Sequence, residues 1–453
     1  MKRKHHRPRR ETPHAEGKLR VGAFVEVLIE RIVPGGAGLA HADGYTLFVT
    51  LVAPGDRVRA RIERVRGKVA FASLAEIIEP APVRIEPPCP YFGRCGGCDF
   101  QQLTYEAQLA AKTEIIRDCL RRISRHEAAD VPITPSPAVW HYRSRARWQH
   151  DRARRLFGYY ELASHRVCDV AECPVVLPEV QAKLSHLRDA LLASDADETT
   201  RTRGLNATTD AREFINTRED AGDFNHHDFN DPEEFQAVAG DDGVSLLPPL
   251  AEADAHERTR TLAGERYRFN ADCFFQINHA LLEPLLAEAL KDAAGETALD
   301  LYCGVGLFTL PLARRFAQVN AVEGNASATH FARLNLSDAS LTNATVHTAR
   351  VGDWLAANAP TLAPIDFLLL DPPRSGAEPE TLKAILALRP RRISYVSCDP
   401  ATLARDLRPL FDAAYTLDSL RAFDMFPQTH HVETVVHLTA THCELQQKIR
   451  LYK

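Results

Sequence analysis

The sequence predicts an α/β protein whose C-terminal domain, residues 264–453, is a doubly wound, Rossmann-like sheet. Short apolar runs alternate there with stretches of helical spacing, the runs being 298–302, 319–323, 365–370 and 393–397 and the helical stretches 327–336 and 380–388. Strands that alternate with helices form βαβ units and a mostly parallel sheet. Three of the runs also end in motifs rich in Gly, Pro or Cys. Ligands of such sheets bind outside the carboxyl ends of the strands, so we expect one composite site at that edge.

Residues 18–78 predict a small N-terminal β-barrel. Apolar residues alternate there in short runs, separated by the turn signals Pro34-Gly-Gly and Pro54-Gly55. Five short strands with such turns are typical of small barrels. The preceding residues 1–17 form a basic tail that we expect to be disordered, because it has too few apolar side chains to pack.

Between the barrel and the α/β domain lies a central unit, residues 79–263, which we expect to be mixed α+β. It opens with a proline-rich linker at 80–90 and continues with helical spacing at 104–123. Its segment 207–243 carries a large excess of acidic residues. Such a composition predicts a solvated insertion.

Length and composition exclude several classes of protein. A chain of 453 residues is too long for one hydrophobic core, which agrees with two or three domains. No apolar run is long enough to span a membrane and the N-terminus lacks the apolar core of a signal peptide, so we expect a cytoplasmic protein. Ten cysteines in so long a chain do not make a disulfide scaffold, and clustered cysteines in a reducing compartment bind metal or react.

One basic cluster predicts contact with nucleic acid. Residues 140–155 hold six Arg against one Asp, interleaved with Trp140, Tyr142 and Trp148. Arginine contacts phosphates and aromatic rings stack on unpaired bases, so the cluster predicts a nucleic-acid surface. The alternative is an ordinary solvated basic face.

The turn Asp300-Leu-Tyr-Cys-Gly-Val-Gly306 predicts a cofactor site. It follows a predicted strand and opens a helix, where glycines let the backbone approach a ligand. Glu323 ends the next strand, at the place from which an acid binds ribose hydroxyl groups. A nicotinamide dinucleotide and S-adenosylmethionine both fit this pattern. The third glycine of the dinucleotide motif is replaced by Thr309, which weakens the first of these.

Cys398 is the candidate nucleophile. It stands between an apolar run and a helix that begins near Pro400, and a thiolate is stabilised at a helix N-terminus. A cysteine at a strand end also has an ordinary packing explanation. Two carboxylates favour chemistry instead: Asp371 ends another strand, and Glu433 begins a third, where a buried carboxylate can act as a general base.

Five motifs together resemble the RNA 5-methyluridine methyltransferase family. They are Phe274–Asn278, Asp300–Gly306, Asp371–Gly376, Ser397–Asp406 and Phe426–Glu433. The barrel likewise resembles a TRAM domain, an RNA-binding module. The resemblance implies a class I, S-adenosylmethionine-dependent methyltransferase domain that methylates uridine C5 in RNA.

The resemblance also implies a role for each candidate residue. Cys398 adds to uracil C6 as a thiolate, C5 then takes the methyl group of S-adenosylmethionine, and Glu433 removes the C5 proton. The target uridine must leave its stack to reach the thiol. The residues that match the family's cofactor and target-base pocket are Gln276, Tyr302, Gly304, Gly306, Glu323 and Asp371.

Three cysteines within ten residues, Cys89, Cys95 and Cys98, predict a metal site. Zinc and an iron–sulfur cluster both fit, and both require a fourth ligand, for which Cys168 and Cys173 are the candidates. The cluster-bearing branch of the family that the chain resembles has its fourth ligand in a Cys-Pro context. This implies a [4Fe–4S] cluster with a structural or RNA-orienting role, on Cys89, Cys95, Cys98 and Cys173.

The other cysteines and the RNA substrate are less constrained. We interpret Cys119, Cys273, Cys303 and Cys443 as packing residues, and Cys168 stays unexplained if Cys173 is the ligand. The combination of barrel and cysteine cluster resembles the branch that acts on 23S ribosomal RNA, with transfer RNA as the alternative. Two other classes stay open, a dinucleotide-dependent oxidoreductase that uses Cys398 and a non-catalytic iron–sulfur RNA-binding protein. We expect a monomer without a membrane partner.

Overall fold

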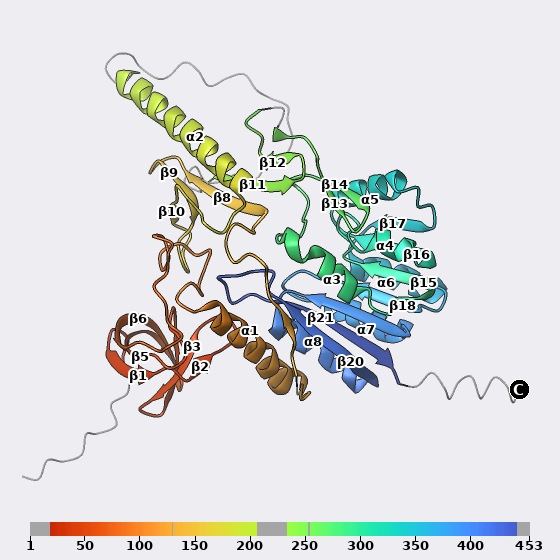
Figure 1. The fold of residues 1–453 in the computed structure, drawn as a ribbon, viewed down its shortest axis with the longest axis horizontal. Helices are drawn as coiled ribbons and strands as arrows, with labels where there is room; N and C mark the ends of the chain where they lie inside the picture. Colours follow the sequence, from red (N-terminus) through yellow and green to blue (C-terminus); the bar gives the residue numbers. More distant parts are fainter. Residues whose placement is uncertain (1–18, 129, 206–232, 252–253, 442–453) are drawn as a thin grey trace, which may run out of the picture. The chain divides into compact units, whose positions relative to one another are not determined.

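A computed structural model describes residues 19–128, 130–205, 233–251 and 254–441 (Figure 1). The chain divides into two compact units, residues 1–85 with 102–104 and residues 86–101 with 105–453. The predicted basic tail, Cys443 and most of the acidic segment 207–243 lie outside the described residues. The predicted bounds of the four segments 1–17, 18–78, 79–263 and 264–453 stay predictions.

The first unit contains a six-stranded sheet in the order β1-β5-β6-β4-β3-β2. Its strands are β1 (Phe24–Leu28), β2 (Arg31–Ile32), β3 (Gly38–Ala42), β4 (Tyr45–Val49), β5 (Arg57–Arg66) and β6 (Val69–Glu79). In β5 the buried residues Val58, Ala60 and Ile62 alternate with exposed arginines, as in a strand with one face on a core. The sheet has one strand more than the five expected, because both β2 and β3 form beside the Pro34-Gly-Gly turn.

The second unit begins with a helix and a five-stranded sheet. Helix α1 (Tyr105–Cys119) continues as one π-helical turn, η1 (Leu120–Ser124), which confirms the helix expected at 104–123. The sheet has the order β10-β9-β8-β11-β12. Its strands are β8 (Arg145–Asp151), β9 (Leu156–Tyr160), β10 (Val167–Asp169), β11 (Glu233–Gly240) and β12 (Gly243–Leu247).

Residues 233–243 differ from the expected solvated insertion. Phe235, Ala237 and Ala239 of β11 are buried, and they pack with Trp148 of β8 in one core. The long helix α2 (Pro178–Leu205) adds apolar side chains at helical spacing to this core, namely Val180, Leu184 and Leu187. The acidic composition of the segment 207–243 led us to overlook β11, a strand whose alternate side chains are apolar.

An eight-stranded sheet carries the candidate site, in the order β17-β16-β15-β18-β19-β21-β20-β7. Its strands are β7 (Ile133–Thr134), β15 (Gly295–Leu301), β16 (Phe316–Glu323), β17 (Ala344–Thr348), β18 (Phe367–Leu370), β19 (Arg392–Ser397), β20 (Tyr415–Phe423) and β21 (Glu433–Ala440). Strands β15 to β19 pair in parallel, whereas β21 runs antiparallel to β19 and β20. The predicted doubly wound sheet is confirmed.

Helices connect the parallel strands (Figure 1). They are α4 (Thr309–Ala313), α5 (Ala326–Asp338), α6 (Val351–Asn358), α7 (Pro379–Leu388) and α8 (Pro400–Asp412), with the 3-10 turn η4 (Ala359–Thr361) after α6. Helix α3 (Leu282–Ala289) and the 3-10 turn η3 (His279–Leu281) precede β15. Helix α4 contacts α5, and α7 contacts both α6 and α8. A two-stranded ribbon, β13 (Arg258–Leu262) and β14 (Glu265–Phe269), precedes α3.

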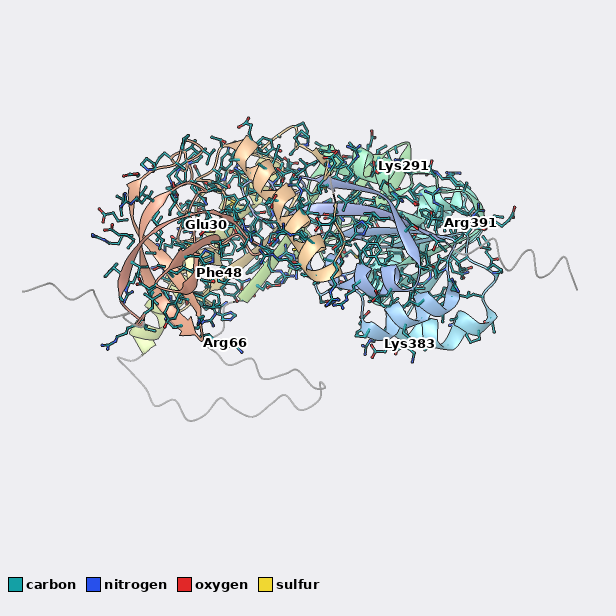
Figure 2. All side chains as sticks on the ribbon, turned by 90° about the horizontal axis from the view of Figure 1, so that it is seen from below. Glu30, Phe48, Arg66, Lys291, Lys383 and Arg391 are labelled. Carbon is teal, nitrogen blue, oxygen red and sulfur yellow. The ribbon has the colours of Figure 1, made fainter. Side chains whose placement is uncertain are left out.

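The burial of β18 agrees with its place inside the sheet. All four of its residues are buried, as in a parallel strand that is covered on both faces. Helix α7 buries Leu382 and Ile385, whereas its Lys383 is exposed and is labelled in Figure 2. Within the described part of the chain, no helix has the length and apolar character needed to cross a membrane.

Candidate active site

The carboxyl ends of three parallel strands bring the candidate residues to one edge of the sheet. Asp371 follows β18 and Cys398 follows β19. Strand β18 lies between β19 and β15, the strand that leads into the glycine turn. Because β21 is antiparallel to β19, its first residue comes to the same edge: Ser397 pairs with Thr434, so Cys398 lies beside Glu433. The nucleophile and the base predicted from the sequence are therefore neighbours.

Helix α8 fixes the position of Cys398. Asp399 caps the helix, since its carboxylate accepts a hydrogen bond of 2.8 Å from the amide of Thr402, and Pro400 occupies the first turn. Burial raises the pKa of the Cys398 thiol to about 12, and the carboxylates of Glu433 and Asp371 act in the same direction. The expectation of a stabilised thiolate is thus wrong for the free protein, because burial and two acidic neighbours outweigh the helix N-terminus.

Glu433 is buried, with only 1% of its surface exposed. Its Oε1 atom has no hydrogen-bond partner among the described residues. Burial, followed by the nearby Asp371, raises the pKa of Glu433 well above its usual value, while the Arg374 guanidinium opposes this effect. A buried carboxyl group with a free oxygen and a raised pKa has the properties of a general base awaiting a substrate.

Asp371 is held by Gln276. The Nε2 atom of Gln276 lies 3.4 Å from Oδ2 of Asp371, and both side chains belong to motifs singled out in the sequence. Burial raises the pKa of Asp371 to about 7; the Gln276 hydrogen bond opposes this rise, and Glu323 adds to it. The structure therefore brings these two predicted residues together.

The glycine turn after β15 folds against the end of β16. The amide of Gly304 donates a hydrogen bond of 3.1 Å to Oε2 of Glu323. Tyr302, Gly304 and Gly306 all have positive φ, and a Cβ atom on Gly306 would lie 3.2 Å from the side chain of Leu310. Glycine is needed here because the turn is left-handed and tightly packed.

Two partners of this turn were not foreseen from the sequence. Thr309, noted only as the replacement of a glycine, donates a hydrogen bond of 2.5 Å from its hydroxyl group to the buried carboxylate of Asp300. Burial raises the pKa of Asp300 to about 7. The hydroxyl group of Tyr302 bonds Oε2 of Glu378, at the N-terminus of α7. The signal available in the sequence was Thr309 itself, which stands three residues after Gly306 in a turn that begins at Asp300.

A second pocket lies elsewhere in this unit and is lined by Cys89, Cys95, Cys98 and Cys173. We call it the thiol pocket. The loop that carries the first three cysteines is attached to β9, because the amide of Gly96 donates a hydrogen bond of 2.9 Å to the carbonyl of Tyr160. A Cβ atom on Gly96 would lie 3.1 Å from that oxygen, which explains the glycine.

Arg143 lines the thiol pocket together with the four cysteines. Its Nε atom is buried and has no hydrogen-bond partner within the described ranges. Burial raises the pKa of Cys95 and Cys98 to about 12, and the neighbouring Cys173 adds to both shifts. As placed in the described structure, no three His, Cys, Asp or Glu side chains converge as the ligands of a metal ion.

The chain is similar to known RNA methyltransferases. A profile of the tRNA (Uracil-5-)-methyltransferase family matches residues 256–359 and 361–441, and a TRAM domain profile matches residues 18–75. The chain is 33% identical to an uncharacterised RNA methyltransferase of Thermosynechococcus vestitus, over 93% of this chain and 99% of that protein. The chain belongs to the RNA uracil-C5 methyltransferase family.

One further relative supports membership of the RNA uracil-C5 methyltransferases, and one solved structure shows the same fold. The chain is 34% identical to a 23S rRNA (uracil(1939)-C(5))-methyltransferase of Pectobacterium atrosepticum, over 90% of this chain and 92% of that protein. A tRNA (uracil-54, C5)-methyltransferase of Pyrococcus abyssi, solved in complex with S-adenosyl-L-homocysteine, has the same fold, with a TM-score of 0.65, 24% identity, and coverage of 92% of this chain and 100% of that one. As a family member, the chain is an S-adenosylmethionine-dependent enzyme that methylates uracil C5 in RNA.

The predicted nucleic-acid surface at 140–155 is not formed as expected. Trp148 is fully buried in the central core, and Tyr142 is 4% exposed and donates a hydrogen bond to the carbonyl of Pro427. Arg143 lines the thiol pocket, and Arg145 donates hydrogen bonds to the carbonyl groups of Cys273 and Ala271. Alternation along β8 turns Trp148 inward and leaves Arg147 exposed, so the aromatic side chains of Tyr142 and Trp148 belong to the interior of the methyltransferase and are not on a binding surface.

The remaining described cysteines do not line the thiol pocket. Cys119, Cys273 and Cys303 are buried, as expected for packing residues. Cys168, on β10, is also fully buried and does not line the pocket. Among the described cysteines, therefore, Cys173 is the fourth thiol of the pocket and Cys168 is not.

Proposed function

We propose that this enzyme methylates C5 of a uridine in 23S ribosomal RNA, with Cys398 as the nucleophile and Glu433 as the general base. The observation that carries this assignment is the pairing of β19 with β21. It sets Cys398 and Glu433 side by side at the edge of the sheet where the glycine turn also ends. An addition and elimination on one pyrimidine ring requires two groups so placed.

The proposed reaction begins at Cys398. Its thiol loses a proton to water and its sulfur forms a bond to C6 of the uracil, which moves an electron pair toward the C4 carbonyl oxygen and makes C5 nucleophilic. S-adenosylmethionine supplies the methyl group that C5 receives. Glu433 then takes the proton from C5, the bond between sulfur and C6 breaks, and 5-methyluridine leaves. Because Glu433 is buried and its Oε1 is unpartnered, it can hold this proton away from water.

The cofactor and the target base are assigned to the neighbouring residues. Glu323, whose Oε2 accepts from the amide of Gly304, is proposed to bind the ribose hydroxyl groups. The turn formed by Tyr302, Gly304 and Gly306 offers backbone to the same ligand. Gln276 and Asp371 form one hydrogen-bonded pair beside Cys398, and we assign them to the cofactor and target-base pocket.

The choice of ribosomal over transfer RNA rests on the curated relatives. The Pectobacterium protein, named for a 23S ribosomal RNA uridine, matches 90% of this chain at 34% identity. The Pyrococcus protein, named for a transfer RNA uridine, is 24% identical and supports the fold alone. Transfer RNA is therefore the second candidate.

We also propose a [4Fe–4S] cluster on Cys89, Cys95, Cys98 and Cys173. Four thiols in one pocket match the number and kind of ligands that such a cluster takes, and the buried guanidinium of Arg143 would balance its negative charge. Zinc is the alternative metal that four thiol ligands could bind. Iron analysis and absorbance near 400 nm of protein prepared without oxygen distinguish them, since zinc gives neither signal.

Methyl transfer to RNA tests the proposed function. Protein, methyl-labelled S-adenosylmethionine and either a 23S ribosomal RNA fragment or bulk transfer RNA are incubated, and the labelled nucleoside is identified. We expect 5-methyluridine in the ribosomal RNA and none with the Cys398→Ala variant. Label only in transfer RNA would transfer the assignment to that substrate, and no label in either RNA would favour a non-catalytic iron–sulfur RNA-binding protein.

A further inference from the structure

The segment that leads into Glu433 is held by residues far away in the sequence. We call this segment, residues 424–432, the base loop. Its polar groups bond side chains and backbone of residues 99–142, namely Asp99, Phe100, Gln108, Lys112, Val139 and Tyr142. These partners lie outside the eight-stranded sheet, whereas the Asp424 amide also donates a hydrogen bond of 3.0 Å to Thr134 of β7 in that sheet.

Gln428 shows how tightly the base loop is held. Its backbone is left-handed, with φ of 68°, a strained conformation for a residue other than glycine. Its amide donates a hydrogen bond of 2.9 Å to Gln108, and its carbonyl accepts from the amides of Asp99 and Phe100 at 3.1 and 3.0 Å. These bonds offset the strain, so losing them would let the loop relax.

Asp99 holds the base loop through both oxygens of its carboxylate. Its Oδ1 accepts a hydrogen bond of 2.8 Å from the amide of His430, and its Oδ2 lies 2.5 Å from Nδ1 of the same residue. The carboxylate therefore closes a ring on His430, three residues before Glu433. About a quarter of each side chain is exposed, 26% for His430 and 23% for Asp99.

Asp99 is also the residue that follows Cys98, a wall of the thiol pocket. One short stretch, Cys98–Phe100, thereby borders the thiol pocket at its start and bonds the base loop at its end. Any ligand that holds Cys98 in place also restrains the peptide that holds Gln428 and His430. The two candidate sites are connected through this stretch.

We propose that Asp99 is a positioning residue, which fixes the base loop so that Glu433 reaches the C5 proton and which makes this placement depend on an occupied thiol pocket. The inference rests on the proposed function. Cys398 is carried by β19 and α8, whereas the side-chain bonds of Asp99 go to His430 of the base loop, so we expect addition to C6 to be independent of Asp99. Removal of the C5 proton by Glu433, in contrast, should depend on Asp99.

Variants of Asp99 separate these two steps. A displacement of about 1 Å can cost about a hundredfold in rate, so we expect Asp99→Ala to lower kcat by between ten- and a hundredfold with little change in KM. Tritium release from C5-tritiated uridine in RNA should fall by the same factor. The covalent complex of Cys398 with RNA should still form, and should accumulate because its elimination is slow.

Two further variants keep this test decisive. Asp99→Asn keeps an oxygen for the His430 amide, so it should lie between the wild type and Asp99→Ala, and it gives the answer if the alanine variant does not fold. Glu265→Ala is the matched control, because Glu265 is another largely buried carboxylate in an ion pair, with Arg314 at 2.8 Å, on β14. Unchanged kcat in both Asp99 variants, or an equal loss of complex formation and tritium release, would overturn the positioning role.

The dependence on the thiol pocket has its own readout. Hydrogen exchange of peptides covering 426–432 should become faster in Asp99→Ala and, in the same peptides, when metal is removed from the wild type by a chelator. Peptides of β15 and β18 should not change. Identical exchange of 426–432 with and without metal would overturn the coupling, whereas absence of methyl transfer by the wild type would instead refute the proposed function.

Discussion

At the scale of single residues, burial raises the pKa of the thiol and of the carboxyl groups that form the site. The pKa of Cys398 is raised to about 12 and that of Asp371 to about 7, in both cases mainly by burial. Arg374 is the cation that opposes these shifts at Cys398 and Glu433. The sequence identified Cys398, Asp371 and Glu433, but not their protonation, because burial depends on all the elements around them.

The reactivity of Cys398 should therefore rise steeply with pH. Since only the thiolate reacts and its pKa is about 12, the alkylation rate should increase about tenfold per pH unit from about pH 7 to about pH 9. Mass spectrometry of the peptide that carries Cys398, after timed exposure to iodoacetamide, measures this rate. A plateau below about pH 9 would contradict the raised pKa.

Arg374→Ala should lower the alkylation rate of Cys398 further at every pH in this range, because the variant removes the cation that favours the thiolate. Arg350→Ala is the matched control, since Arg350 is an exposed arginine beside Asp353. Equal rates in the wild type and Arg374→Ala would show that this guanidinium does not act on the thiol.

Asp371 should make stability depend on pH. Its carboxyl group has a folded pKa of about 7 against a usual value of about 3.9, so its contribution to stability is complete below about pH 4 and is lost as the pH rises through 7. Asp371→Asn stays neutral and keeps an acceptor for Gln276. Urea unfolding should show the variant gaining stability relative to the wild type at about pH 8 and much less at about pH 5; a constant difference would exclude this explanation.

At the scale of elements, the sequence predicted best where one period dominates. The strands β15, β16, β18 and β19 and the helices α1, α5 and α7 lie where apolar spacing placed them. Prediction failed where a segment has many charged residues, because these drew attention away from the alternation of its apolar side chains. The acidic window contained β11, and the basic cluster contained β8, whose Trp148 faces the core. The bonds between α1 and the base loop join residues about 300 positions apart and leave no local pattern.

Lys112 of α1 should be the residue on which this contact depends most. Its ammonium group and the carboxylate of Asp424 are both fully buried, and it also donates to the carbonyl of Phe426. Lys112→Met leaves the Asp424 charge buried and unpaired, so we expect a loss of about 3 kcal/mol in the free energy of unfolding. Lys112→Met combined with Asp424→Leu should recover most of that loss; an unrecovered double variant would refute the ion-pair explanation.

At the scale of the whole molecule, two pockets of different chemistry occur in one compact unit. The thiol pocket gathers four cysteines, and the sheet edge gathers Cys398 with its carboxylates. Motif spacing was sufficient to separate the two groups of cysteines. It did not reveal Arg143 in the first pocket, nor the stretch Cys98–Phe100 that joins them, because both depend on the packing of distant segments.

Arg143 should be required to retain the cluster. Its buried guanidinium has an unpartnered Nε and faces thiol ligands whose cluster would be anionic. Arg143→Gln should lower the iron content per chain at least several-fold, while Arg147→Gln, on the exposed side of β8, should leave it unchanged. Equal iron in the wild type and Arg143→Gln would show that this charge is not needed.

The central claim is that Cys398 adds to a uridine of RNA while Glu433 removes the C5 proton. A ribosomal RNA fragment with 5-fluorouridine in place of uridine tests it most directly, because fluorine cannot leave as a proton and the covalent intermediate persists. After reaction with S-adenosylmethionine and digestion, mass spectrometry should find the peptide that carries Cys398 linked to a methylated fluorouridine. An adduct on another cysteine, or none while methyl transfer to normal RNA proceeds, would contradict the account.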